Sequence, residues 1–540
     1  MLEKGIFMKR KFKLELSLLL VSSLLILMFL PASVQYNANA AELIYGDVNG
    51  DKAVDAIDFA LLKSYLIGNI SKLPVENWNE SADVNLDGSV DAVDFSLIKS
   101  LLMGKISSLP VGIETPIAPQ LTKNAEGLMT YSGLTVVSYG GYLNGESFQQ
   151  EGIISYKGYQ YTAFWNTNRS VVMARRALPN GGWEKFEFTD YHNTENDAHN
   201  TISLGVCPND GTLHLAFDHH GNDLHYRKSN NGFLDNPTTS KWEASSFGKV
   251  TSALAGSKVT LVTYPKFVTT PQGNMLLEYR YGTSGSGDQH LYEYNGTSHT
   301  WQNIGKYIDG ITNSINAYPH GLAFDKNNRL HMTWCWRETP DATTNHDLLY
   351  IYSEDNGRTW KNNVGNNVAK TGSSYITKNS EGIKVFTINQ NRGLINQEDM
   401  SIDYEGRIHV LLSHMPDSQA DNSNFTTART KSTFFHYWRD TNGNWNRTNM
   451  GFPVVSNFRG KLAVSAANNL YAILPDLRIT AASAATKWTD WKLVDTQSSG
   501  KFFSDPLIDK SRLKLEGDKL TILYPQKSSP NISYLDYAIK

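Results

Sequence analysis

The sequence contains very little cysteine, with only Cys207 and Cys335 among its 540 residues. An oxidising compartment would permit a disulfide between them, but nothing in the sequence favours one. Neither sign of charge is in excess, because 50 Lys and Arg stand against 53 Asp and Glu, a formal net charge of -3. The chain therefore lacks the basic field that attracts a phosphate backbone, and we expect no nucleic-acid partner.

Long apolar runs are also scarce. The run LSLLLVSSLLILMFL, residues 16–30, follows a basic segment and precedes the small residues ANAA. This order is typical of a cleaved export signal. We predict a signal peptide over residues 1–40 and a secreted protein. No second apolar stretch of spanning length follows, so we expect no membrane partner.

An internal repeat follows the signal. GDVNGDKAVDAIDFALLKSYLIGNIS, residues 46–71, returns as ADVNLDGSVDAVDFSLIKSLLMGKIS, residues 82–107. Each copy opens on D-x-N-x-D, has aspartates at loop positions 9 and 12, and so offers the oxygen ligands that calcium prefers. The apolar spacing behind each loop predicts a short helix that ends at glycine. We expect two calcium ions, held by Asp47, Asn49, Asp51, Ala53, Asp55 and Asp58 in one loop and by Asp83, Asn85, Asp87, Ser89, Asp91 and Asp94 in the other.

The loops differ from a standard EF-hand in having aspartate at position 12 and no entering helix. Residues 44–109 resemble a type I dockerin, a calcium-folded module that docks enzymes onto the cohesins of a cellulosome scaffold. The resemblance implies a cohesin partner, a cellulosomal location and a cargo directed at plant cell walls, although dockerins usually stand at the C-terminus. It also implies that loop positions 10 and 11 contact the cohesin. These positions are Ala56, Ile57, Ala92 and Val93.

The rest of the chain has the pattern of an all-β protein. Residues 110–122 bear prolines and little charge, which predicts a linker. Residues 123–540 contain short strand-like runs at even spacing, which indicates a sandwich, a barrel or a propeller. DGTLHLAF, NNRLHMTW and EGRIHVLL repeat a turn before an apolar-His-apolar strand, and SEDNGRTW (Ser353–Trp360) matches the Asp-box of BNR propellers. Roughly 420 residues in blades of roughly 60 give seven. We predict a mainly all-β fold, a seven-bladed β-propeller, with the small α-helical dockerin module at its N-terminus.

Five of the fourteen histidines lie within residues 197–229. This stretch and residues 333–360 resemble the BNR-type propeller family that includes ulvan lyases and enzymes cleaving L-rhamnose-α-1,4-D-glucuronate bonds. In those lyases two histidines act with a later tyrosine and arginine, at a spacing that four residues match here. They are His199, His219, Tyr264 and Arg280, and a one-residue slip would put His220 in place of His219. The candidate substrate-binding residues from the two stretches are Asn200, His220, Arg337 and His346.

The resemblance implies β-elimination beside a uronic acid. Arg280 with a histidine would neutralise the C6 carboxylate, so that charge can develop there as H5 is removed. A base must take H5 and an acid must protonate the leaving O4. Both lie on one face of glucuronate, so one group can do both. We expect this group to be Tyr264, its pKa lowered by nearby cations, with His199 sharing the proton transfer.

The sequence predicts a monomeric, cellulosome-associated polysaccharide lyase that cleaves rhamnosyl-glucuronate linkages in plant or algal polysaccharide. Rhamnose-capped glucuronate on arabinogalactan proteins is the preferred target. Two alternatives remain: an α-L-rhamnosidase or other glycoside hydrolase on the same propeller, and a non-catalytic carbohydrate-binding propeller. A structural zinc ion is a further expectation, although the spacing of its ligands matches no zinc motif. Its candidate ligands are His320, Cys335, His346 and His414.

Overall fold

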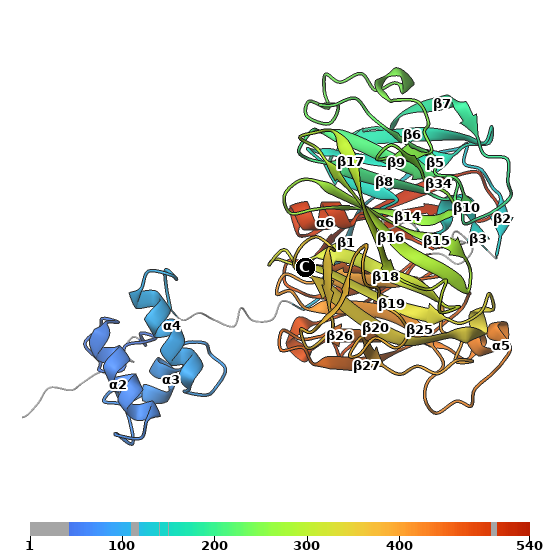
Figure 1. Ribbon diagram of the computed structural model, residues 1–540. Helices are drawn as coiled ribbons and strands as arrows, with labels where there is room; N and C mark the ends of the chain where they lie inside the picture. Colours follow the sequence, from blue (N-terminus) through green and yellow to red (C-terminus); the bar gives the residue numbers. More distant parts are fainter. Residues whose placement is uncertain (1–42, 110–117, 140, 149–150, 498–504) are drawn as a thin grey trace, which may run out of the picture. The chain divides into compact units, whose positions relative to one another are not determined.

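The computed structural model describes residues 43–109, 118–139, 141–148, 151–497 and 505–540. The signal peptide predicted over residues 1–40 and residues 110–117 of the predicted linker lie outside these ranges. The chain divides into two compact units, Met1–Thr115 and Pro116–Lys540, which we describe one at a time (Figure 1). In neither unit is a described helix long and apolar enough to cross a membrane.

The N-terminal unit is α-helical, as the repeat predicts. Its helices are α2 (Ala56–Leu66), α3 (Trp78–Ala82) and α4 (Ala92–Leu102). Asp55 caps α2 by accepting a hydrogen bond from the Ile57 main chain, and Asp58 completes a capping box. Asp91 and Asp94 repeat this arrangement at α4. The aspartates expected to bind calcium therefore also determine where each helix begins.

The sequence repeat is also a structural repeat. Asp58 accepts hydrogen bonds from main-chain N–H groups of its own loop at 2.8 to 3.2 Å, and Asp94 does the same in the second loop. The rings of Phe59 in α2 and Phe95 in α4 stack with their centroids 4.2 Å apart. Equivalent side chains of the two copies thus meet in one small core.

Strands dominate the β-rich unit, residues 118–540, so the expected mainly all-β class is confirmed (Figure 1). Three four-stranded sheets follow chain order. They are β4 (Ile153–Tyr156), β5 (Tyr159–Trp165), β6 (Ser170–Ala177) and β7 (Glu184–His192); β24 (Asp399–Ile402), β25 (Ile408–His414), β26 (Thr433–Arg439) and β27 (Trp445–Pro453); and β28 (Lys461–Val464), β29 (Leu470–Ile473), β30 (Arg478–Ala482) and β31 (Lys492–Thr496). A three-stranded sheet contains β8 (Ile202–Cys207), β9 (Thr212–Phe217) and β11 (Tyr226–Lys228).

The largest sheet has eleven strands and contains two antiparallel groups joined by one parallel pair, Gly287 with Asn316. The first group is β14 (Val262–Thr269), β15 (Met275–Thr283), β16 (Ser286–Asn295) and β17 (Thr300–Ile308), with β10 (His220–Asn222) at its edge. The second group is β18 (Asn316–Phe324), β19 (Leu330–Arg337), β20 (Asn345–Ser353), β21 (Thr359–Lys361), β22 (Asn367–Lys370) and β23 (Lys384–Phe386).

The last sheet joins the two ends of the unit. Its strands are β32 (Leu507–Ile508), β33 (Lys519–Pro525), β34 (Ile532–Ile539) and β1 (Leu121–Thr130), which pairs antiparallel with β34. Smaller elements are the hairpins of β2 (Val137–Ser138) with β3 (Gly141–Tyr142) and of β12 (Ala253–Leu254) with β13 (Ser257–Lys258), and the helices α5 (Phe425–Thr430) and α6 (Lys510–Glu516).

Apolar clusters fill the space between successive sheets. Tyr161 of β5 and Leu215 of β9, for example, belong to a cluster shared by the first two sheets. The same holds at each later step along the chain, and one of these clusters lies between the two groups of the eleven-stranded sheet. Leu523 of the last sheet then packs with Ile153 and Phe164 of the first. Each sheet is thus covered on both faces by its neighbours.

The Asp-box is a turn between β20 and β21, where the sequence places it. The Asp355 side chain accepts hydrogen bonds from the main chain of Arg358 at 3.0 Å and of Thr359 at 2.7 Å. Trp360 is fully buried beneath it and stacks on Tyr307 with a centroid distance of 4.9 Å. The box therefore orders the turn and anchors it in the core.

Both cysteine thiols are free and buried. Cys207 ends β8 and Cys335 lies in β19, in separate sheets. Burial raises the pKa of each thiol to about 12, which keeps both protonated near neutral pH.

Buried histidines give the protein a defined response to acid. Burial lowers the pKa of nine of them, so the folded chain stays unprotonated at these sites where the unfolded chain binds protons. They are His199, His214, His219, His290, His320, His331, His409, His414 and His436. We expect the thermal unfolding midpoint to fall as the pH is lowered from about 7 to about 5.

Buried carboxyls with raised pKa values, such as Glu151 at about 8 and Glu398 at about 7, act in the opposite direction. They are outnumbered by the histidines in this pH window. Calorimetry at several pH values checks the prediction, and a midpoint that is constant or rises toward pH 5 would contradict it.

Candidate active site

Neighbouring strands bring three of the expected site residues together. His220 in β10 pairs with Thr263 in β14, and Thr263 pairs in turn with Arg280 in β15. Tyr264 follows Thr263 directly. An Arg280 N–H group also donates a hydrogen bond of 3.0 Å to the Thr263 hydroxyl. Sheet pairing therefore fixes the spacing of His220, Tyr264 and Arg280.

Tyr264 stands on an irregular stretch of β14. The register between β14 and β15 shifts between Thr263 and Lys266, and Tyr264 has a φ of 56°, which is uncommon for a residue with a side chain. Its ring lies 5.1 Å from the ring of Phe148 and 4.9 Å from the Arg280 guanidinium carbon. Strained backbone that persists at such a bulge is characteristic of functional sites.

His199 joins this group from the loop before β8. Its ring stacks on His220 at 4.0 Å and on Phe148 at 4.9 Å, and its centroid is 5.8 Å from that of Tyr264. Asp197 accepts a 2.7 Å hydrogen bond from the Nδ1 atom of both histidines. This carboxylate therefore fixes the Nδ1–H form of each ring and leaves each Nε2 with a lone pair.

The charge state of His199 follows from its surroundings. Burial lowers its pKa to about 4, although the hydrogen bond to Asp197 acts in the opposite direction. His199 is therefore neutral near pH 7 and can accept a proton at Nε2. Ligand atoms of Asp197, His199 and His220 lie within 4.8 Å of one another, so this group could hold a metal ion.

Two buried arginines flank the tyrosine without an acidic partner. Arg280 is 2% exposed and Arg337 is 9% exposed, and neither forms an ion pair with any described residue. The guanidinium of Arg337 is held by Asn345 at 2.7 Å and by Asn396 at 3.0 Å. Buried positive charge without a counterion is unfavourable, so this site favours an anion.

Tyr318 of β18 is a site residue that the sequence did not identify. Its hydroxyl accepts hydrogen bonds from Arg337 at 3.2 Å and Arg280 at 3.4 Å. Burial acts to raise the pKa of Tyr318, but the two arginine charges and the Ser284 hydroxyl outweigh it and lower the pKa below its usual value. A repeat could have revealed it, because Tyr-Pro-Lys at 264–266 returns as Tyr-Pro-His at 318–320.

The expected lowering of the Tyr264 pKa is wrong. Burial raises this pKa, Tyr318 adds to the rise, and the charges of Arg280 and Arg337 oppose it only in part. Tyr264 is therefore a neutral phenol near pH 7, suited to giving a proton rather than taking one.

One candidate from the histidine-rich stretch, His219, contacts other residues, and another, Asn200, is buried. His219 is 1% exposed, and its Nε2 accepts a hydrogen bond from the main chain of His225, whose ring lies 5.5 Å away. Asn200 is fully buried. His220 thus takes the place expected for His219, since adjacent residues of an extended chain point to opposite sides. The assignment of Asn200 to substrate binding stays a prediction.

The four residues expected to hold zinc do not lie close enough together to bind one ion. The ring nitrogens of His414 contact Tyr437 and the Met415 carbonyl, and those of His346 contact Glu338 and Asp347. No metal-sized group among the described residues contains His320, Cys335, His346 or His414. The expectation that His346 binds substrate stays a prediction.

Asp197 should control the tautomers of both site histidines. Replacing it in Asp197→Asn removes the charged acceptor shared by the two Nδ1–H groups, so we expect both rings to become tautomer mixtures. Nitrogen NMR of imidazole-labelled protein near neutral pH measures this. Asp190→Asn, which alters the ion pair of half-exposed Asp190 with buried Arg227, is the matched control. Unchanged Nδ1–H signals in Asp197→Asn would contradict the prediction.

Comparison with known proteins shows which family each unit matches. Residues 159–452, more than half of the chain, match the model of a BNR repeat-containing family member, and the chain belongs to this family. Residues 45–103 match the dockerin type I domain, which identifies the N-terminal unit.

Two of the relatives that this chain resembles are ulvan lyases. The chain is 24% identical over 316 residues to the long isoform of ulvan lyase from Pseudoalteromonas sp. (strain PLSV), which covers 48% of this chain and 31% of that protein. It is 22% identical over 438 residues to the long isoform from Glaciecola sp. (strain KUL10), covering 71% and 41%. The chain thus spans less than half the length of these relatives. The polysaccharide lyase Uly1 has the same fold, with a TM-score of 0.56, 17% identity and coverage of 78% of this chain and 98% of that one.

Proposed function

We propose that this protein is a secreted, cellulosome-associated polysaccharide lyase that cleaves rhamnosyl-glucuronate linkages by β-elimination. One observation carries the proposal: two buried guanidinium groups, Arg280 and Arg337, have no acidic partner in the described part of the chain and face two tyrosines and a neutral imidazole. A uronate carboxylate supplies the missing negative charge. The ulvan lyase relatives support the same reaction class.

In the proposed reaction two protons move, one from C5 of the uronate to the enzyme and one from the enzyme to the leaving O4. The Nε2 atom of His199 takes H5, and the C5–H electron pair develops as an enolate-like charge on the carboxylate that Arg280 and Arg337 stabilise. Tyr264 donates its phenolic proton to O4 as the C4–O4 bond breaks and a C4–C5 double bond forms. The roles expected from sequence are thereby divided, because Tyr264 is protonated and His199 is not.

The fold we propose is the expected seven-bladed propeller. Counting β14–β17 and β18–β21 as separate blades gives seven groups of consecutive strands, and an apolar cluster lies between each group and the next. The pairing of β1 with β34 then joins the chain ends within the last blade. We also propose a dockerin over residues 44–109, an export signal over residues 1–40, and a monomer. The proposed propeller begins with β1 at Leu121, two residues before the expected limit of 123.

The substrate follows from both units. Ulvan lyase relatives favour a polymer with uronic acid, and a dockerin favours land-plant cell walls, so rhamnose-capped glucuronate on arabinogalactan proteins is our preferred target. A glycoside hydrolase or a purely binding propeller would produce no unsaturated sugar. Incubation with gum arabic, ulvan and pectin, followed by ultraviolet absorbance of the conjugated uronate, therefore separates a lyase from the other two functions. No absorbance with any of the three polymers would overturn the lyase proposal.

Loss of the Tyr264 hydroxyl should stop turnover and leave binding intact. In Tyr264→Phe we expect kcat to fall by roughly 10²-fold or more, because general acid catalysis contributes a factor of that order. Affinity for the polymer, measured by affinity electrophoresis, should change little. Tyr279→Phe, in the neighbouring strand, is the matched control and should retain activity. Retained activity in Tyr264→Phe would assign the acid role to another group.

The dockerin unit fits calcium and a cohesin. Each loop offers aspartate, asparagine and main-chain oxygens, an all-oxygen donor set that suits a hard cation. In both loops the first aspartate accepts a hydrogen bond from the main chain of position 6, and the asparagine amide donates to the aspartate at position 5. The expected cohesin-contact residues Ile57 and Val93 are 55% and 49% exposed, beside exposed Ala56 and Ala92. We propose that these four residues contact an apolar face of the cohesin.

We expect each of the two loops to bind one calcium ion independently of the other. We expect titration calorimetry to give two calcium ions per chain and one in Asp58→Ala, because that change removes the last acidic ligand of one loop. Asp417→Ala, an exposed aspartate of the β-rich unit, should still bind two. Two full sites in Asp58→Ala would contradict the ligand assignment.

A further inference from the structure

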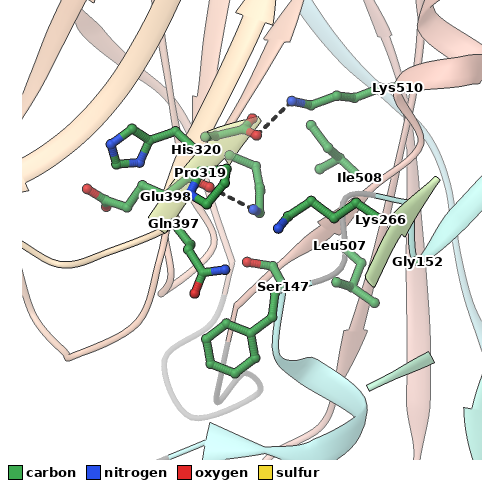
Figure 2. Close-up of a pocket in the computed structure, with 13 residues that line it drawn as sticks. Ser147, Gly152, Lys266, Pro319, His320, Gln397, Glu398, Leu507, Ile508 and Lys510 are labelled. Atoms are coloured by element: carbon green, nitrogen blue, oxygen red, sulfur yellow. Dashed lines mark hydrogen bonds and ion pairs between the residues drawn. The ribbon is translucent and has the colours of Figure 1, made fainter. Parts of the chain in front are cut away.

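A second polar cavity lies next to the candidate active site. Its lining includes Ser147, Phe148, Lys266, Gln397 and Lys461, from separate parts of the β-rich unit (Figure 2). Phe148 belongs to both places, because its ring also stacks on His199. The proposed reaction uses none of the other residues named here.

Two ammonium groups in this cavity are poorly neutralised. Lys461 is 8% exposed and forms no ion pair among the described residues; its Nζ donates one hydrogen bond, of 2.8 Å, to the Glu398 carbonyl. Lys266 is 4% exposed, and its Nζ makes two long contacts, with the Tyr264 carbonyl at 3.4 Å and with the Glu278 carboxylate at 3.5 Å. Lys510 differs, because Asp399 pairs with it at 2.7 Å. Lys266 and Lys461 thus retain N–H donors for a further acceptor.

Gln397 adds a donor that has no partner. The residue is 3% exposed, and its Nε2 has no hydrogen-bond partner among the described residues. Asn396 donates to its Oε1 at 2.8 Å, which fixes the orientation of the amide. The backbone of Gln397 has a φ of 59°, so a strained conformation holds the side chain in place. Figure 2 shows this amide and the Lys266 amine directed into the same space.

Two side chains that line the cavity and could accept hydrogen bonds, Glu398 and His320, do not pair with the Lys266 amine or the Gln397 amide. In Figure 2 the Glu398 carboxylate and the His320 ring lie on the far side of the cavity from Lys266. Buried Glu398 interacts there with the charge of Arg429. The cavity therefore combines two incompletely paired cations with an unpaired amide N–H₂, and buried donors of this kind require an acceptor.

From these observations we infer that the cavity is a binding site for a small inorganic anion, held by Lys266, Lys461 and Gln397. The inference is independent of the proposed lyase activity, because the site uses neither Tyr264 nor the two arginines. Charge-assisted hydrogen bonds from ammonium and amide groups suit both a halide and a tetrahedral oxyanion.

Anomalous scattering tests the site directly. Crystals of the full chain soaked in bromide or in selenate should show an anomalous peak between Lys266, Lys461 and Gln397. A peak with bromide would indicate a halide site, and a peak with selenate a site for a tetrahedral oxyanion. Calorimetry with that anion should show at least about tenfold weaker binding in Lys461→Met and in Gln397→Leu, since each loses a charge-assisted or amide hydrogen bond. Lys326→Met, a half-exposed lysine paired with Glu405, is the control and should bind as the wild type does.

Two results would overturn the inference: no peak in the cavity with either probe, or undiminished affinity in Gln397→Leu. Gln397→Leu is nearly isosteric and uncharged, so it remains informative if Lys461→Met fails to fold. Neither measurement involves polysaccharide, so failure here leaves the lyase proposal untouched, and failure of the lyase assay leaves this site untouched.

Discussion

The sheets of the β-rich unit bury apolar side chains on both faces, and this constraint organises everything else. A sheet covered on both sides needs two neighbours, so the chain must bring its last sheet back against its first. Met129 and Leu523 do this by packing with Ile153 and Phe164, and the pairing of β1 with β34 ties the two ends together. Strands distant in sequence are thereby held in fixed positions.

That fixed packing permits unusual electrostatics near β14. Arg280, Arg337 and Lys266 are all buried. The Arg280 guanidinium lies 4.9 Å and the Lys266 amine 5.8 Å from the centroid of the Tyr264 ring. Among the described residues, Glu278 is the one carboxylate that pairs with any of these three cations, at 3.5 Å from Lys266. A less rigid protein would relax by exposing them to water, because desolvating an unpaired cation is costly. The bulge at Tyr264 and the strained backbone of Gln397 show the same rigidity.

Sequence reasoning succeeded where the signal was local. The duplicated loops, their capping aspartates and the Asp-box are each encoded within about a dozen residues, so a turn and its hydrogen bonds can be anticipated without the fold. His199, Tyr264 and Arg280 came from a family resemblance, and the structure brings them together. His219 was misplaced because one residue along an extended chain reverses the side on which a ring lies. The zinc ligands were misplaced because residue type alone carries no information on distance.

The sequence by itself determined the two-unit organisation, the β-rich class and the loops that suit calcium, since these depend on repeats and periodicity within short segments. Only the tertiary structure decided which side chains meet. It placed Tyr318 and Phe148 beside Tyr264, gave Asp197 to two histidines at once, and set the protonation of Tyr264 through burial. These outcomes depend on how far each group is removed from water and on charges supplied by strands distant in the chain, and no local pattern encodes either.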